Sequence, residues 1–302
     1  MSADRSTDLR IELSQRVLLC DGAMGTQLIL RGLPVGVCGE TWNLDNPQAV
    51  EAIHRAYREA GCDLLTTNTF GATTTNLERH HLAEKAHALN VAGAQLARRA
   101  AGDSAWVLGD IGPFGGFLEP LGETTEAQLL AIFRAQAEGL REGGADGIII
   151  ETMGDPAEVS VAIRAAKEVT DWPVIATYAF AKAEDGSFRT LMGTRVGEAM
   201  AAAAKAGADI IGANCGTALG LPEYIELAKQ LVAAARPSGT GVILQPNAGA
   251  PQMIDGKMVH PATPQEMAAL VHPFIDAGLR IIGGCCGTTP EHLRAMAAKL
   301  KD

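Results

Sequence analysis

The chain has 302 residues, of which 47% are hydrophobic and 4% aromatic, and its formal net charge at pH 7 is −10. This charge argues against a nucleic-acid or anionic-membrane surface, and few aromatic side chains are available to stack on bases. The segment 1–16 is polar and charged, and no apolar run approaches the ~18 residues of a membrane span. We therefore expect a cytoplasmic protein with no nucleic-acid or membrane partner. In that compartment its six cysteines are expected to be metal ligands, catalytic groups or core residues rather than disulfides.

Short apolar runs alternate along the chain with segments of helical spacing. The predicted strands are residues 17–21, 63–70, 106–111, 147–152, 174–180, 210–215, 242–247 and 281–285. The predicted helices are residues 47–60, 76–100, 126–142, 156–169, 195–206, 222–235, 264–277 and 290–301. Several of these helices begin with Pro near their first position, where its missing N–H costs nothing.

This alternation predicts an α/β protein. Most of the strands are apolar on consecutive residues, which is typical of strands buried on both faces of a parallel sheet. Eight β-then-α units in a chain of this length predict a (β/α)8 TIM barrel, and an open doubly wound sheet is the alternative. No Pro- or Ser-rich linker interrupts the pattern. We therefore expect a single domain over residues 1–302, with the barrel core at about 17–300.

Two local features refine the barrel. Gly-Cys-Asp and Gly-Ala-Asp recur before strands, at Gly61, Gly144 and Gly207, and we interpret them as one repeated helix-to-strand turn. The longest irregular segments are 32–46 and 112–125, and both are rich in Gly and Pro. We expect these two segments to be lids over the active face.

Three cysteines fall where a TIM barrel builds its active site, which is the C-terminal ends of the strands and the loops after them. Cys215 ends the sixth predicted strand, and Cys285 and Cys286 end the eighth on a Gly-rich loop. Strands six and eight have the same parity, so we expect the three sulfurs to converge across the barrel mouth.

Three thiolates are a soft donor set that suits Zn²⁺. A structural zinc site is closed by a fourth protein ligand, whereas a catalytic one keeps a position open. The seven histidines all fall on predicted helices or loops, so the sequence predicts one Zn²⁺ per chain with an open position. A zinc ion there would hold a thiol substrate as the thiolate at neutral pH.

The remaining thiols and two polar residues are assigned to structural roles. Free cysteines often pack in cores as small hydrophobes, and we assign Cys20, Cys38 and Cys62 to that class. Asn68 and Asp110 are weaker candidates for a site, and we expect them to shape loops through local backbone bonds.

Two carboxylates follow purely apolar runs at strand ends. Asp21 ends the first predicted strand and Glu151 the fourth, and such charges are rarely buried unless paired. The pair would hold the ammonium group of an amino-acid substrate, with the backbone amides of Gly22 and Ala23 taking its carboxylate. The alternative is that each carboxylate caps the following helix or pairs with an arginine.

Four segments together carry a resemblance to one family. They are DGAMGT at 21–26, TNTF at 67–70, GANCG at 212–216 and GGCCGT at 283–288. This set resembles the homocysteine S-methyltransferase family, which includes the homocysteine-binding module of cobalamin-dependent methionine synthase and, more distantly here, betaine–homocysteine methyltransferase. The likeness runs from about residue 17 to the end and implies a barrel in which Cys215, Cys285 and Cys286 hold zinc.

The resemblance also implies a substrate and a reaction. Homocysteine, or a related thiol, would bind zinc through its sulfur with its amino group near Asp21 and Glu151, and its thiolate would attack a methyl donor to give methionine. In the methionine synthase branch, an Asn matching Asn247 would occupy the open zinc position when substrate is absent.

The methyl donor stays open. We expect no folate or cobalamin module in this chain, and Thr152 stands where the betaine branch has a tyrosine. The candidate donors are a methylcorrinoid on a separate partner protein, S-methylmethionine and betaine. An alternative function is a non-autonomous zinc- or thiol-binding subunit of a multi-component corrinoid-dependent methyl-transfer system. A zinc-free barrel lyase or aldolase is disfavoured because no Lys ends a predicted strand.

Overall fold

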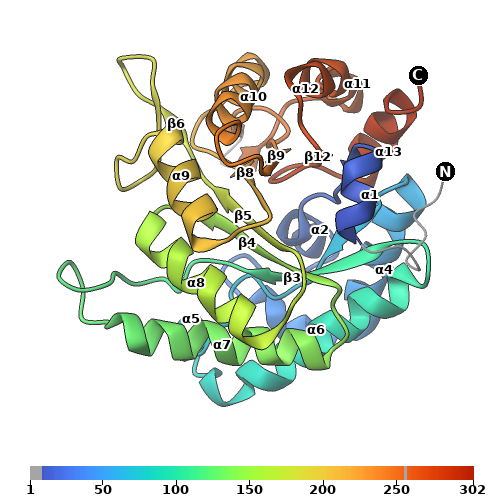
Figure 1. Ribbon diagram of the computed structural model, residues 1–302. Helices are drawn as coiled ribbons and strands as arrows, with labels where there is room; N and C mark the ends of the chain where they lie inside the picture. Colours follow the sequence, from blue (N-terminus) through green and yellow to red (C-terminus); the bar gives the residue numbers. More distant parts are fainter. Residues whose placement is uncertain (1–8, 255–256) are drawn as a thin grey trace.

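Eight parallel strands close into a barrel in the computed structural model, which describes residues 9–254 and 257–302 (Figure 1). Around the barrel the strands follow the order β1-β12-β9-β8-β5-β4-β3-β2. The circle is completed where Cys20 pairs with Leu64, and the Asp21 N–H donates to the Leu64 carbonyl at 3.0 Å. The predicted TIM barrel is therefore confirmed, and the open doubly wound sheet is excluded. The barrel strands are β1 (Leu18–Leu19), β2 (Leu64–Thr66), β3 (Trp106–Ile111), β4 (Gly147–Met153), β5 (Val174–Tyr178), β8 (Ile210–Asn214), β9 (Gly241–Gln245) and β12 (Ile281–Ile282).

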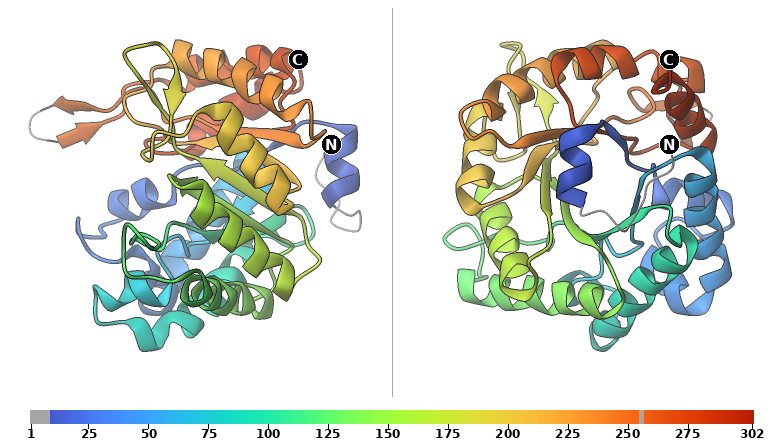
Figure 2. Two further views of the ribbon diagram at one scale, coloured as in Figure 1. Left: turned by 60° about the vertical axis from the view of Figure 1, so that its left-hand side comes forward. Right: turned by 45° about the vertical axis from the view of Figure 1, so that its right-hand side comes forward.

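Helices surround the barrel and cover the outer faces of its strands (Figure 2). The larger ones between the strands are α4 (Pro47–Ala60), α6 (Ala86–Ala101), α7 (Glu126–Glu142), α8 (Pro156–Val169), α9 (Val196–Ala206), α10 (Leu221–Ala235), α12 (Val271–Ala277) and α13 (Pro290–Lys299). The shorter helical segments are α2 (Met24–Leu30), η1 (Gly39–Thr41), α3 (Trp42–Asp45), α5 (Thr74–Glu78), η2 (Ala83–Lys85) and α11 (Pro264–Ala268). Among the described residues, no helix combines the length and apolar character needed to cross a membrane.

Two predicted helices are each broken in the structure. The prediction of one helix over 76–100 is wrong, because His81 takes a left-handed backbone conformation with φ of 57° between α5 and α6, which a continuous right-handed helix does not allow. The predicted helix 264–277 divides into α11 and α12. Pro273 then lies in the first turn of α12, where its missing N–H leaves no bond unmade.

The barrel interior is filled by apolar side chains that alternate with outward-facing ones. On β3, Trp106 and Leu108 belong to the interior cluster, whereas Val107 belongs to the cluster between strands and helices. Both faces of each strand are therefore buried, which is why the predicted strands read as continuous apolar runs. The interior cluster comprises Leu9, Leu13, Leu18, Cys20, Leu64, Trp106, Leu108, Ile149, Ile175, Ile210, Ile243 and Ile281.

The repeated Gly-x-Asp motif makes the same turn three times, as interpreted from the sequence. Gly61, Gly144 and Gly207 have φ values of 104°, 90° and 99°, in the left-handed region that glycine tolerates best. Each following aspartate accepts a backbone N–H from the neighbouring strand with its Oδ2 atom. These bonds join Asp63 to Leu19 (2.9 Å), Asp146 to Val107 (2.8 Å) and Asp209 to Val174 (2.9 Å).

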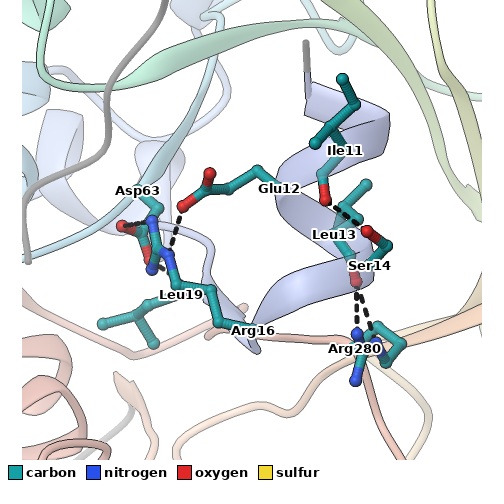
Figure 3. A network of polar contacts seen from close by, with 8 residues as sticks. All are labelled: Ile11, Glu12, Leu13, Ser14, Arg16, Leu19, Asp63 and Arg280. Carbon is teal, nitrogen blue, oxygen red and sulfur yellow. Dashed lines mark hydrogen bonds and ion pairs between the residues drawn. The ribbon is translucent and has the colours of Figure 1, made fainter. Parts of the chain in front are cut away.

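A helix that the sequence did not predict, α1 (Leu9–Gln15), lies across the N-terminal opening of the barrel (Figure 2). Its Leu9 and Leu13 join the interior cluster. The Arg280 guanidinium donates to the Leu13 carbonyl at 3.0 and 2.6 Å, and Arg16 pairs with Glu12 at 2.5 Å and with Asp63 at 2.9 Å (Figure 3). The helix therefore plugs this end of the barrel.

Two hairpins were also missed by the sequence analysis. One is β6 (Ala181–Lys182) with β7 (Phe188–Arg189) after β5, and the other is β10 (Gln252–Ile254) with β11 (Lys257–Val259) after β9. Both follow the C-terminal ends of barrel strands, and the β10–β11 hairpin projects away from the barrel body (Figure 2).

Candidate metal centre and ligand pocket

A ring of polar side chains lies above the apolar interior, at the C-terminal end of the barrel. Because successive strand residues point to opposite faces, a residue two positions after an interior one also points inward. In this way Thr66, Asp110, Glu151, Thr177 and Gln245 follow the interior residues Leu64, Leu108, Ile149, Ile175 and Ile243. A cavity of about 370 Å³ opens at this end, and its wall includes Asp110, Glu151, Gln245 and the three cysteines predicted to converge.

The three cysteine sulfurs meet in one cluster. The Sγ atoms of Cys215, Cys285 and Cys286 all lie within 4.8 Å of one another, and those of Cys215 and Cys286 are 3.8 Å apart. Cys20, Cys38 and Cys62 are buried elsewhere, as expected of core thiols. The sulfurs from the sixth and eighth barrel strands therefore converge at the mouth.

The backbone around each cysteine is held by hydrogen bonds that do not belong to regular strands. Cys215 has a left-handed φ of 54°, and its N–H donates to the Gln245 carbonyl at 3.0 Å. The Cys285 N–H donates to the Pro246 carbonyl at 2.8 Å, and the Cys286 carbonyl accepts from the Ala248 N–H at 2.9 Å. The loop after β9 therefore connects both parts of the sulfur cluster.

The sulfur atoms share protons unequally. Interactions with the neighbouring Cys285 and Cys286 side chains lower the pKa of Cys215 from 9.0 to about 2. The same contacts, together with burial, raise the pKa of Cys286 to about 12 and the pKa of Cys285 well above its usual value. A cation bound at the cluster would lower the pKa of all three thiols.

The geometry fits a tetrahedral zinc ion. A Zn–S bond of about 2.3 Å places the sulfurs of a tetrahedral site about 3.8 Å apart, which matches the separation of Cys215 and Cys286 Sγ. Within the residues described, the group that clusters here contains these three cysteines and no histidine or carboxylate. Three sulfurs with one side facing the cavity are the donor set of an open zinc site.

Asn214 connects the sulfur cluster to the wall of the pocket. Its Oδ1 atom accepts from the Thr152 N–H at 2.8 Å and from the Thr177 hydroxyl at 2.7 Å. Its Nδ2 atom donates to Thr152 Oγ1 at 2.7 Å and lies 3.7 Å from Cys285 Sγ. The sequence analysis missed this residue, although its position four residues after interior Ile210 would have placed it on the inner face.

The two carboxylates predicted to hold an ammonium group are placed differently. Asp21 accepts from the Thr66 N–H and hydroxyl, both at 2.9 Å, and is absent from the described residues that line the cavity. Burial raises the pKa of Asp21 to about 7. Glu151 lines the cavity, and its pKa is raised to about 8 by burial and then by the Asp21 carboxylate. Among the described residues, neither carboxylate forms an ion pair with an arginine, and neither caps a helix.

Asp110 was expected to shape a loop, and that expectation is wrong. It lies on β3, its side chain reaches the cavity wall, and its Oδ1 atom is buried without a hydrogen-bond partner among the described residues. Strand alternation turns it inward two residues after Leu108. Asn68 does shape a loop, because its Nδ2 atom donates to the Gly39 carbonyl at 3.0 Å and to Asn43 Oδ1 at 2.9 Å.

The other predicted binding residues lie near the cavity or the cluster. Gly22 and Ala23 line the cavity, but the Ala23 N–H already donates to Thr288 Oγ1 at 3.1 Å. Asn247 donates through Nδ2 to the Gly216 carbonyl at 3.3 Å, and its buried Oδ1 atom has no partner in the described chain. The Asn247 side chain also contributes to the lowered pKa of Cys215, and its bond to Gly216, the residue after Cys215, places it beside the cluster.

One of the two expected lids covers the pocket. Residues 33–37, 39 and 40 line the cavity, so the segment 32–46 lies over it. The segment 112–125 contributes no residue to the described wall. Its start packs beside α5 instead, where Asn76 and Thr75 donate to the Pro113 and Phe114 carbonyls.

The fold and the cluster define a class of protein, namely a TIM barrel with three clustered cysteine sulfurs at its C-terminal mouth. A family model described as homocysteine S-methyltransferase matches residues 18–300, and the chain belongs to this family.

The curated relatives include much longer proteins. The chain is 37% identical over 308 residues to methionine synthase of Mycobacterium leprae (strain TN), and 36% identical over 306 residues to that of Mycobacterium tuberculosis (strain ATCC 25618 / H37Rv). Each alignment covers 97% of this chain but only 25% of the relative. The chain therefore spans about a quarter of the length of these relatives.

Solved structures share the fold. The metallated form of the homocysteine methyltransferase MmuM from Escherichia coli superposes with a TM-score of 0.78 at 23% identity, covering 96% of this chain and 99% of that one. A methyltransferase from Methanosarcina mazei superposes with a TM-score of 0.62 at 11% identity, covering 99% and 98% of the two chains.

Proposed function

We propose that this protein is a zinc-dependent methyltransferase that takes homocysteine as its methyl acceptor and forms methionine. The observation that carries the proposal is the cluster of Cys215, Cys285 and Cys286 sulfurs, open to a cavity in a chain of the homocysteine S-methyltransferase family. Zinc bound there would lower the pKa of a coordinated substrate thiol, so that the sulfur is a thiolate at neutral pH.

The protein's own residues would bind and orient the acceptor. The cavity wall offers the carboxyl of Glu151 to its ammonium group. Gly22 lines the same cavity beside the Gly-rich loop, where the Gly284 N–H donates to the Asp21 carbonyl at 3.0 Å. Asn214 fixes Cys285 and Thr152 relative to each other. The segment 32–46 covers the site and limits the access of water to the reacting sulfur.

Asn247 would occupy the open position of the metal when no thiol substrate is bound. Its Oδ1 atom is buried and lacks a partner in the described chain, while its amide nitrogen donates beside the cluster. An unpaired buried oxygen is costly, and a metal ion at the sulfurs would satisfy it. We assign Asn247 the position that the incoming thiol takes over.

The methyl group would be delivered by another protein component, for which a methylcorrinoid is the candidate carrier. Support comes from the 37% and 36% identity of the chain to two methionine synthases. S-methylmethionine and betaine are the alternative methyl donors, and the experiment below includes both. The quaternary ammonium of betaine would meet few aromatic side chains, since Phe70 is the aromatic residue among the described wall.

The experiment offers each donor in turn to zinc-loaded protein with homocysteine and measures methionine. The proposal predicts methionine with at least one donor, and loss of both zinc and product in Cys215→Ser. The proposal would be refuted if no donor supported methionine formation and if Cys215→Ser kept the zinc content of the wild type. Zinc and thiol binding without turnover, until a corrinoid protein is added, would favour the non-autonomous subunit.

A further inference from the structure

One carboxyl group of the cavity wall is buried and only incompletely hydrogen-bonded within the described part of the chain. Asp110 is only 4% exposed, and its Oδ1 atom accepts no hydrogen bond from the described residues. Its backbone is fixed, because the Asp110 N–H donates to Thr67 Oγ1 at 2.9 Å and its carbonyl accepts from Thr69 Oγ1 at 2.7 Å. The strand therefore holds the side chain toward the cavity, while nothing compensates for the burial of this oxygen.

A second carboxyl lies beside it. Asp110 and Glu151 extend inward from the adjacent strands β3 and β4, and both residues line the cavity. By contrast, the other acidic groups near the cavity are occupied. Asp21 accepts two bonds from Thr66, and Glu40 accepts from the Gly71 N–H at 2.6 Å.

The ionisable side chains in the described wall of the cavity are all acidic. Its described wall contains Glu40, Asp110, Glu151 and three cysteines, but no lysine, arginine or histidine. Buried acidic groups normally have a basic partner or a cation. Since this wall provides no basic side chain, the complementary positive charge is expected from the ligand.

The position of the carboxyl pair also fits the length of the ligand. Asn214 Nδ2 lies 3.4 Å from Glu151 Oε2 and 3.7 Å from Cys285 Sγ. A single side-chain amide thus separates the carboxyl pair from the sulfur cluster. A ligand with its sulfur at the cluster and a cationic group a few bonds away would reach both.

We propose that Asp110 is a specificity-determining residue that binds, together with Glu151, the primary ammonium group of the acceptor thiol. This inference rests on the proposed function, and it deepens that function by assigning amine recognition to Asp110 and Glu151, with Asp21 bound to Thr66 below the wall. Two carboxyl groups suit a donor with several N–H bonds. A quaternary ammonium or a sulfonium has no such donor and is usually enclosed by aromatic rings, of which this wall has one.

The test compares two thiols of the same chain length by calorimetry with zinc-loaded protein. Homocysteine carries the ammonium group, and 4-mercaptobutyrate lacks it. We expect the wild-type protein to bind homocysteine about tenfold or more tightly than 4-mercaptobutyrate. Asp110→Asn should lose most of that preference by weakening homocysteine binding alone, with zinc content unchanged.

Matched variants separate binding from folding. Asp103→Asn changes an exposed aspartate before the opposite end of β3 and should keep the full preference. Asp110→Ser removes the carboxyl with a smaller side chain and should lose the preference as Asp110→Asn does. If folded, zinc-loaded Asp110→Asn or Asp110→Ser keeps the wild-type preference, or if the wild-type protein has none, the inference is overturned. A wild-type protein that binds neither thiol would instead refute the proposed function.

Discussion

Asn214 holds Thr152 in a left-handed backbone conformation. Thr152 has φ of 62°, a value that β-branched residues rarely adopt, and Asn214 binds both its N–H at 2.8 Å and its hydroxyl at 2.7 Å. The register of β4 with β5 shifts at this point, between Ile150 and Met153. Such irregularities are common next to active sites, and this one lies directly beside Glu151 in the cavity wall. The strain therefore supports the geometry of the pocket.

Replacing this asparagine should weaken metal binding. Asn214→Ala leaves the Thr152 N–H and the Thr177 hydroxyl without their acceptor, at a cost of about 1–3 kcal/mol in the free energy of unfolding. It also removes the contact to Cys285 Sγ, and loss of such supporting contacts weakens metal affinity roughly 10- to 100-fold. Zinc affinity measured against a chromophoric chelator would test this.

Asn43 is the matched control for that variant. It is also buried, and its Nδ2 atom donates to the Asn68 and Leu89 carbonyls at 2.8 and 3.1 Å. Asn43→Ala should lower stability to a similar degree without changing zinc affinity. Equal zinc affinities in the wild type and in Asn214→Ala would contradict the positioning role.

The glycine after the cysteine pair should be irreplaceable. Gly287 has φ of 79°, and a Cβ atom there would overlap the His260 side chain. Gly287→Ala should therefore shift the loop that carries Cys285 and Cys286 and reduce the zinc bound per chain. Gly197→Ala, in α9 where no heavy atom lies within 4 Å of the new Cβ, should retain full zinc content. Metal analysis of both purified proteins would decide, and full zinc content in Gly287→Ala would count against the proposed ligand loop.

A buried histidine should make the fold sensitive to acid. Both ring nitrogens of His54 are buried without a partner in the described chain, and burial lowers the pKa of His54 from 6.5 to about 4. Between these values the unfolded chain binds a proton that the folded protein does not, so stability falls as the pH decreases. From pH 7 to pH 5 this residue should cost about 2 kcal/mol.

The measurement is the difference between two stability curves. Urea unfolding of the wild type and of His54→Leu at several pH values isolates the contribution of His54 from those of other groups. The loss between pH 7 and pH 5 should be smaller in the variant by about the stated amount. His272→Leu, which changes an exposed histidine, should follow the wild-type curve. Parallel curves for wild type and His54→Leu would show the prediction to be wrong.

The helical plug should affect stability alone. Leu13 is 8% exposed and packs in the barrel interior, whereas Ile11 on the same helix is 50% exposed (Figure 3). Leu13→Ala should lower the free energy of unfolding by about 2–4 kcal/mol, and Ile11→Ala should change it little. Zinc content and homocysteine binding should stay at wild-type levels in both, because this end of a TIM barrel supports stability rather than chemistry. Weaker homocysteine binding in Leu13→Ala would contradict that separation.

The barrel could be predicted because its signals are local and repeated. Continuous apolar strands, Pro at helix starts and the Gly-x-Asp turn recur unit after unit, and α4, α7 and α8 begin and end at the predicted residues. Helix α1 escaped because seven residues are too few to show helical periodicity, and its two buried leucines matter only through the barrel end that they fill. The hairpins after β5 and β9 escaped because they carry no interior pattern.

The residues of the candidate site also differ in how far local sequence patterns could predict them. The cysteine cluster could be predicted because two adjacent thiols on a Gly-rich loop have no packing reason. Asp110 was misassigned because it was judged as the end of a strand rather than by its alternation with Leu108. The role of Thr66 as the partner of Asp21 depends on the register between β1 and β2, which no single segment of sequence reveals.

Because α1 and the packed interior close the N-terminal end of the barrel, the ligand cavity opens at the C-terminal end. A methyl carrier large enough to cover this opening would block the path of the small acceptor into and out of the cavity. Acceptor loading must then precede docking of the carrier, and the carrier must depart before the methylated amino acid escapes. For a donor of that size we therefore expect an ordered reaction, in which the acceptor binds first and the product leaves last.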